Sequence, residues 1–236
     1  MSVRFEEHEG GDLKIFLNPE PGMVYTMGVD AATGLANDNS AVCVLSNALP
    51  FTQVASYRAR VPVNQFTAIV DKMGRYYNEA LNVCEINYPG NSVQDALLQY
   101  YKYPRNYKPE THLKADYGIT EQFGLRTTEI TKWLLINETQ LALSNGDLIL
   151  NDINTLSEFI NFVYQSSKRK AAAAEGFNDD LVIAAMLAYH GAKLYPFARI
   201  LKLDTKPKKI ILPDYDRAWK DFKAKFANGP EKGVIA

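Results

Sequence analysis

The chain has 236 residues, of which 47% are hydrophobic and 22% charged, so it is long enough for one large domain with a substantial core. The formal net charge of -1 excludes an overall basic nucleic-acid binder, although a local basic patch stays open. The two cysteines, Cys43 and Cys84, lie in apolar runs, which predicts buried thiols and excludes a disulfide framework or a cysteine-based zinc site. No signal-peptide core and no apolar run of about 18 residues occurs, which predicts a soluble, cytoplasmic protein.

The first half of the chain predicts an antiparallel meander that continues into a parallel strand. Apolar runs at residues 24–30, 40–46 and 51–61 are separated by short turns, which is typical of three antiparallel strands. Helical spacing follows at 62–82, with Asn64 as the expected N-cap. A short apolar run at 82–87 then leads into a predicted helix at 92–101, where Ser92 and Asp95 resemble a capping box. Because a helix between two strands is the crossover that parallel pairing requires, we expect an α/β fold with a mixed central sheet flanked by helices.

The second half predicts mainly helices. Residues 102–124 are rich in Tyr, Lys and Pro and predict irregular structure. Apolar spacing then favours helices at 128–145, which Gly146 would end, at 155–165 and at 178–193, with a brief strand at 147–150 and a loop at 166–176.

The composition changes after Leu203. Residues 201–236 contain nine Lys and Arg against five Asp and Glu, a net charge of +4. We therefore expect a domain over 1–203 and a basic tail over 204–236, in which Trp219, Phe222 and Phe226 could lie on one face of a short helix.

Four acids stand out because they lie at the ends of apolar elements. Asp30 ends the first long strand, Glu85 lies in the short apolar run, and Asp179 and Asp180 open the last apolar helix. Each also has an ordinary structural explanation. Asp30 could form a turn or a cap, Glu85 could point to solvent from an edge strand, and Asp179 and Asp180 could stabilise the helix dipole. Acids in such positions are rarely buried unless they are paired or bind a metal ion.

These acids converge if the strands of Asp30 and Glu85 are neighbours and the last helix packs across them. Converged carboxylates raise one another's pKa or recruit a cation. A donor set made only of oxygen favours Mg²⁺ or Mn²⁺ over zinc. Two such ions would activate a water and stabilise the leaving oxygen of a phosphodiester, which is nuclease chemistry.

Three segments carry a resemblance to a known family. VYTMGVDAATGLANDNSAVCVL, CEINYPGNS and GFNDDLVIAAMLA resemble, in this order, the acidic motifs of an RNase H-like, RuvC-type nuclease. More narrowly, they are similar to the C-terminal nuclease domain of the large terminase subunit of tailed bacteriophages. The segment GLRTTEITKWLLINETQLALSNGDLILND also resembles that family, and the similarity covers about residues 15–203.

The resemblance implies an RNase H-like fold and a role for each acid. Asp30 would bridge two Mg²⁺ or Mn²⁺ ions, Glu85 would be the second acid, and one or both of Asp179 and Asp180 would complete the catalytic set. Asp38 matches a further acid of the family, although an Asp beside Asn in a turn also has a turn role. The implied activity is cleavage of concatemeric double-stranded DNA during genome packaging in the cytoplasm of an infected bacterium.

The implied partners are double-stranded DNA, the portal, the small terminase subunit and the terminase ATPase domain. The phosphate loop of that ATPase, GxxxxGK[ST], does not occur in this sequence, so we expect the motor to be supplied from outside it. Two basic segments are candidate phosphate contacts, and the residues concerned are Lys102, Arg105, Lys108, Lys168, Arg169 and Lys170.

Three other functions remain open on the sequence alone. A junction-resolving or RNA–DNA hybrid nuclease would share the same acids. An actin-like ATPase also begins with an Asp-containing hairpin, but it needs a second phosphate hairpin and a Gly-rich adenosine loop, which we do not find. A docking module that has lost its chemistry is the third alternative.

Overall fold

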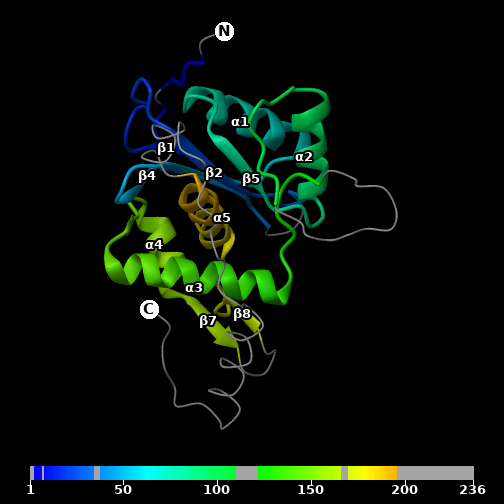
Figure 1. The fold of residues 1–236 in the computed structure, drawn as a ribbon. Helices are drawn as coiled ribbons and strands as arrows, with labels where there is room; N and C mark the ends of the chain where they lie inside the picture. Colours follow the sequence, from blue (N-terminus) through cyan, green and yellow to red (C-terminus); the bar gives the residue numbers. More distant parts are fainter. Residues whose placement is uncertain (1–2, 7, 35–37, 110–121, 166–169, 196–236) are drawn as a thin grey trace, which may run out of the picture.

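A mixed β-sheet lies between two layers of helices (Figure 1). The computed structural model describes residues 3–6, 8–34, 38–109, 122–165 and 170–195. The strands are β1 (Leu13–Ile15), β2 (Tyr25–Asp30), β3 (Ser40–Ser46), β4 (Phe51–Ala59), β5 (Leu81–Cys84), β6 (Leu148–Ile149), β7 (Phe162–Gln165) and β8 (Lys170–Ala173). The helices are α1 (Val63–Tyr76), α2 (Gly90–Gln99), α3 (Glu129–Asn145), α4 (Ile153–Ile160) and α5 (Asp180–Leu194). No helix of the described residues is long and apolar enough to cross a membrane.

The central sheet has the strand order β1-β4-β3-β2-β5, with β6 paired to β4 beside β1. Strands β2, β3 and β4 form the predicted antiparallel meander, and β5 pairs parallel to β2. Helix α1 makes the crossover between β4 and β5, as parallel pairing requires. The predicted α/β class with a mixed sheet flanked by helices is therefore confirmed.

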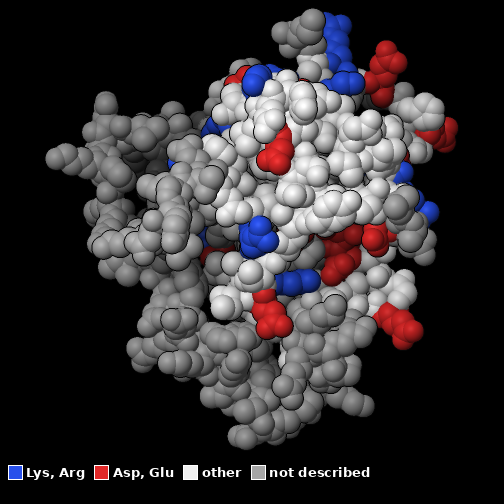
Figure 2. Space-filling view, turned by 90° about the vertical axis from the view of Figure 1, so that its right-hand side faces the viewer, with Lys and Arg blue, Asp and Glu red and all other residues white. Residues whose placement is uncertain are grey.

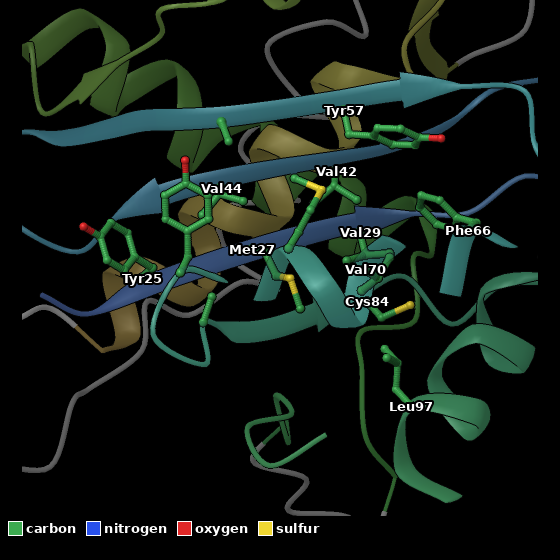
Figure 3. Packing of buried hydrophobic residues seen from close by; sticks show 14 of the residues in the cluster. Tyr25, Met27, Val29, Val42, Val44, Tyr57, Phe66, Val70, Cys84 and Leu97 are labelled. Atoms are coloured by element: carbon green, nitrogen blue, oxygen red, sulfur yellow. The ribbon is translucent and has the colours of Figure 1, made fainter. Parts of the chain in front are cut away.

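The two faces of the sheet carry different side chains because successive residues of a strand point to opposite faces. Tyr25, Met27 and Val29 of β2 pack with Phe66 and other residues of α1 and α2 in one apolar cluster (Figure 3). On the other face, alternate residues of β3 (Ala41, Cys43 and Leu45) pack against α5. Both cysteines are free and buried, as predicted.

Helix α5 lies unusually close to the sheet, and Gly28 makes this possible. A methyl group on Gly28 would overlap the backbone carbonyl oxygen of Ala184 and the backbone nitrogen of Ala188. Helix α5 is apolar all round, which is typical of a helix enclosed by other elements, and its residues from Leu181 to Ala192 are buried. Gly28 and Asp30 are two residues apart, so Asp30 also lies on the face that α5 covers.

Two sequence predictions in the second half are wrong. Residues 155–165 were expected to be one helix, but α4 ends at Ile160 and Phe162 begins β7. The loop expected at 166–176 contains β8, which pairs antiparallel with β7. Phe162 is buried in a cluster with Trp133 and Leu135 of α3, so burial in the tertiary structure overrides the helical spacing.

Three predicted helix ends can also be compared with the structure. Helix α1 begins after Pro62 and α2 after Pro89, and neither has a side-chain cap, so the expected roles of Asn64, Ser92 and Asp95 are wrong. Pro62 and Pro89 hold the N-cap positions instead, and a proline side chain has no oxygen that could accept a hydrogen bond from the first helical amides. The end of α3 at Gly146, which has a φ of 73°, is confirmed.

Candidate functional site

Asp30 and Glu85 lie side by side where β2 and β5 end. Asp30 is the last residue of β2, and Val29 pairs in parallel register with Cys84, the last residue of β5. The amide of Glu85 donates to the carbonyl oxygen of Val29 at 2.9 Å, which continues this pairing one residue past the strand. Strand β5 ends at Cys84, so Glu85 lies one residue beyond the strand in which the sequence placed it. Among the described residues, Glu85 forms one isolated β-bridge, with Leu125.

The N-terminus of α5 lies at the same end of the sheet. Asp180 is its first residue and Asp179 its N-cap residue. The carboxyl groups of both residues raise the pKa of Asp30 through their charge, as does that of Glu85. The structure thus brings together Asp30, Glu85, Asp179 and Asp180, the four acids that the sequence singled out.

Asp30 is the most perturbed of these acids. Desolvation by the surrounding protein raises the pKa of its carboxyl group well above the ordinary value. The charge of Glu85 and a hydrogen bond between the two carboxyl groups raise it further. Two carboxyl groups in such contact hold a proton between them, or they hold a cation.

Asp180 shares this environment at the helix end. Burial raises the pKa of Asp180 to about 6, and the charges of Glu158 and Asp179 add to the effect. The side-chain amide of Asn39 opposes it by donating to Oδ2 of Asp180 at 3.2 Å. Asp180, like Asp30, is partly buried.

Three polar neighbours of the acids were missed as site residues. Asn39 contacts Asp180, and Asn87 donates to Oε1 of Glu85 at 3.2 Å and to the carbonyl oxygen of Thr127 at 2.8 Å. The ammonium group of Lys132 lies 3.8 Å from Oδ2 of Asp179. Asn39 and Asn87 stand within two residues of Asp38 and Glu85 in the acidic motifs, so closeness to the acids was a usable signal. Lys132, on α3, lies in the segment that also resembles the terminase family, but it stands apart from the acidic motifs.

Asp38 differs from the four acids. It is exposed, and its charge is not among the causes of the raised pKa of Asp30 or Asp180. Its neighbour Asn39 makes the contact with Asp180 instead. Asp38 is thus linked to the acidic group only through its neighbour in sequence, among the described contacts, and its predicted metal-binding role stays a prediction.

The candidate DNA-contacting residues are only partly described. Lys102 and Lys108 are exposed and Arg105 is partly buried. Lys168, Arg169 and the side chain of Lys170 lie outside the described residues, as does the tail predicted at 204–236. Figure 2 shows one face on which acidic side chains gather to the right of centre; among the described residues there, Lys and Arg are scattered rather than clustered.

The carboxyl groups of Asp30 and Glu85 are in direct contact, whereas Asp179 and Asp180 act on Asp30 through their charge. In the described part of the chain, no three His, Cys, Asp or Glu side chains are arranged so that they could hold one metal ion as they stand. The donor set itself fits a hard divalent cation, because it consists of carboxylate oxygens and one of them is desolvated beside another acid. Binding at this group would require the carboxylates to turn toward the ion.

The metal-free protein is expected to gain stability as the pH falls from about 7 to 5, the range in which Asp180, with a pKa of about 6, takes up its proton. The folded-state pKa values of Asp30 and Asp180 lie above the ordinary value of about 3.9 that an unfolded chain would show. Between the two values the folded state binds more protons than the unfolded state, so the free energy of unfolding decreases as pH rises through this window. Mg²⁺ should remove this loss by replacing the protons. Urea denaturation at several pH values, with Mg²⁺ and with EDTA, measures both effects; an EDTA series that loses stability toward pH 5 would contradict the expectation.

Comparisons with known proteins find similarity at the level of structure. No family model matches the chain, and no curated protein sequence matches it. The large terminase nuclease from thermophilic phage G20c with bound magnesium is 19% identical, with 80% of this chain and 92% of that chain covered and a TM-score of 0.63. Its cobalt-bound form gives the same identity and coverage and a TM-score of 0.62.

A second phage protein gives a similar match. The large terminase nuclease domain of Thermus phage P74-26 is 19% identical, covers 80% of this chain and 89% of its own, and has a TM-score of 0.60. At this identity the likeness shows the fold. The chain has the fold of terminase nuclease domains, which confirms the RNase H-like architecture expected from the three motifs.

Proposed function

We propose that this chain is the nuclease domain of a phage large terminase and cleaves double-stranded DNA with the help of divalent metal ions. The observation that carries the proposal is the contact between the carboxyl groups of Asp30 and Glu85, at the ends of adjacent parallel strands, with Asp179 and Asp180 within electrostatic reach. The shared fold with terminase nucleases of phages G20c and P74-26 supports the same reading.

Divalent ions fit this group of acids. The large terminase nuclease from phage G20c, which has a similar fold, has been solved with bound magnesium, cobalt or zinc, which supports a site for divalent ions here. Asp30, Glu85, Asp179 and Asp180 would hold the ions, with Asp30 as the shared ligand and Asp38 as a further one. Bound there as Mg²⁺ or Mn²⁺ in a pair, they would activate a water and stabilise the leaving oxygen of a phosphodiester.

The residues around the acids would orient them. Asn87 donates to Glu85 and is itself held by the carbonyl oxygen of Thr127, so the Glu85 carboxylate has a defined direction. Asn39 likewise donates to the Asp180 carboxylate. Such outer partners fix the ligand geometry on which metal affinity depends.

DNA would approach the exposed side of the acids. Lys102, Arg105 and Lys108 would contact phosphates without reading base sequence, as would Lys168, Arg169 and Lys170. In the packaging complex, we infer that a terminase ATPase domain, the small terminase subunit and the portal are partners. The concatemeric viral DNA in the cytoplasm of the infected host would be the substrate.

Cleavage of supercoiled plasmid is the test of this function. We expect conversion to nicked and linear forms with Mg²⁺ or Mn²⁺ and none with EDTA. The same assay on a four-way junction and an RNA–DNA hybrid separates duplex cutting from the related nuclease activities, because only the duplex should be cut efficiently. Full activity in EDTA, or no cleavage of any substrate with either metal, would contradict the proposal.

A further inference from the structure

The N-terminus of α5 is capped by a side chain from another helix. An aspartate at the N-cap position usually accepts hydrogen bonds from the amides two or three residues later. Asp179 holds this position, but its side chain makes no such bond. The amides of Leu181 and Val182 are the usual donors to an aspartate at this position. Here they donate instead to Oε2 of Glu158, at 2.8 and 3.4 Å.

Glu158 is itself firmly held. It lies on α4, its exposed fraction is 5%, and its other carboxylate oxygen pairs with the guanidinium of Arg58 on β4. Burial raises the pKa of Glu158, while the Leu181 amide and the Arg58 charge favour its ionised form. One carboxylate thus ties the start of α5 to both α4 and β4.

Arg58 lies in line with the acidic group. In the sheet register Asp30 pairs with Ala41, and Ala41 pairs with Arg58, so all three lie in one row across β2, β3 and β4. The link from Arg58 through Glu158 to Leu181 therefore connects the start of α5 to the row of the sheet that contains Asp30.

We propose that Glu158 is a positioning residue that caps α5 in place of Asp179, so that the Asp179 carboxylate is not committed to the helix end and can bind metal beside Asp180. This inference rests on the proposed function. Without Glu158, two buried amides would lose their acceptor, which is a costly arrangement. The nearest replacement is the side chain of Asp179, the usual cap for those amides, and rotation into that role would draw it away from the metal ions.

An effect of charge alone makes a different prediction. Glu158 is negative and its charge already raises the pKa of Asp180, so its removal could weaken cation binding without any movement. Glu158→Gln removes the charge but keeps an acceptor oxygen at the same reach. Glu158→Asp keeps the charge but withdraws the oxygen by one methylene. The two variants separate capping from charge.

Calorimetric titration of the full chain with MnCl₂, without DNA, tests the proposal. We expect Glu158→Ala and Glu158→Asp to bind Mn²⁺ about tenfold more weakly than wild type, at the lower end of the usual loss for an outer-shell partner. Glu158→Gln should remain within about threefold. If Glu158→Ala does not fold, Glu158→Asp alone tests the capping role. The urea midpoint of each variant shows whether it is folded.

Glu138→Gln is the matched control. Glu138, on α3, pairs with His190 and Lys193 near the other end of α5, so its loss perturbs the same helix far from the acids. Its urea midpoint should fall while its Mn²⁺ affinity stays at the wild-type value.

The outcomes are distinguishable. Wild-type affinity in both Glu158→Ala and Glu158→Asp overturns the positioning role and leaves the proposed function standing. A loss in Glu158→Gln equal to that in Glu158→Ala, with Glu158→Asp unaffected, overturns it in favour of charge. A wild-type protein that neither binds Mn²⁺ nor cleaves DNA overturns the proposed function and the inference with it.

Discussion

Asp30→Asn is expected to abolish DNA cleavage while the protein stays folded. The Asp30 carboxylate would be shared by both metal ions, and a neutral amide cannot replace its charge. Loss of several kcal/mol of charge stabilisation corresponds to a loss in cleavage rate of about a thousandfold or more. Cleavage rates of plasmid at saturating Mg²⁺ measure this directly.

The same substitution should stabilise the metal-free protein. An ionised carboxyl group at position 30 is desolvated and repelled by Glu85, Asp180 and Asp179, as its raised pKa records. An amide removes that cost and can donate to Glu85, so the urea midpoint at neutral pH should rise. A rise in stability together with a loss of activity is the signature of a functional residue that the fold does not need.

Asp95→Asn is the control for Asp30→Asn. Asp95 is exposed on α2, and α2 packs on the sheet face opposite α5, so this variant should keep wild-type cleavage and stability. Cleavage by Asp30→Asn above a tenth of the wild-type rate would contradict the central role of Asp30. A strong fall in its stability would contradict the electrostatic explanation.

Gly28→Ala is expected to destabilise the protein severely and to weaken metal binding in the molecules that still fold. The added methyl group meets the backbone of Ala184 and Ala188, and backbone atoms of a buried helix cannot turn aside as a side chain can. We expect a loss of roughly 3 kcal/mol in the free energy of unfolding, the upper end of the usual cost of overpacking. Because α5 must move off the sheet, Asp179 and Asp180 should also move away from Asp30.

Gly191→Ala makes the matched comparison. This glycine lies in the same helix–sheet interface, but its added methyl group would meet the side-chain methyls of Val83 and Thr26. Small side-chain shifts and the better helix propensity of alanine should limit the loss to about 1 kcal/mol. Urea midpoints and Mn²⁺ titrations of both variants test the explanation, which fails if Gly191→Ala is the more damaging of the two.

The elements of the first half were predictable because their signals are local. The meander β2–β4 shows short turns between apolar runs, and α1 shows apolar residues at helical spacing. The pair β7 and β8 was not predictable in the same way. Phe162 fits a helical pattern and a strand pattern equally, and only its burial against Trp133 decides between them.

In the candidate site, too, residues with a local signal were predictable and residues defined by long-range contacts were not. Asp30, Glu85, Asp179 and Asp180 could be chosen from the sequence, because a charge at the end of an apolar element is costly without a partner. Their neighbours Lys132 and Glu158 could not, because a single lysine or glutamate within a helix carries no charge pattern that marks it. Their roles follow from contacts between separate elements.

The fold class, the strand that ends in Asp30 and the four acids at element ends follow from the sequence alone, since they depend on hydrophobic spacing and on the cost of burying charge. How closely the acids meet, and which residues hold them there, depends on contacts between elements far apart in the chain. The close approach at Gly28 depends on the backbone of α5, more than 150 residues further along the chain. The cap on α5 joins Glu158 to an amide 23 residues away, and no periodicity in a sequence encodes a hydrogen bond between a side chain and a distant backbone group.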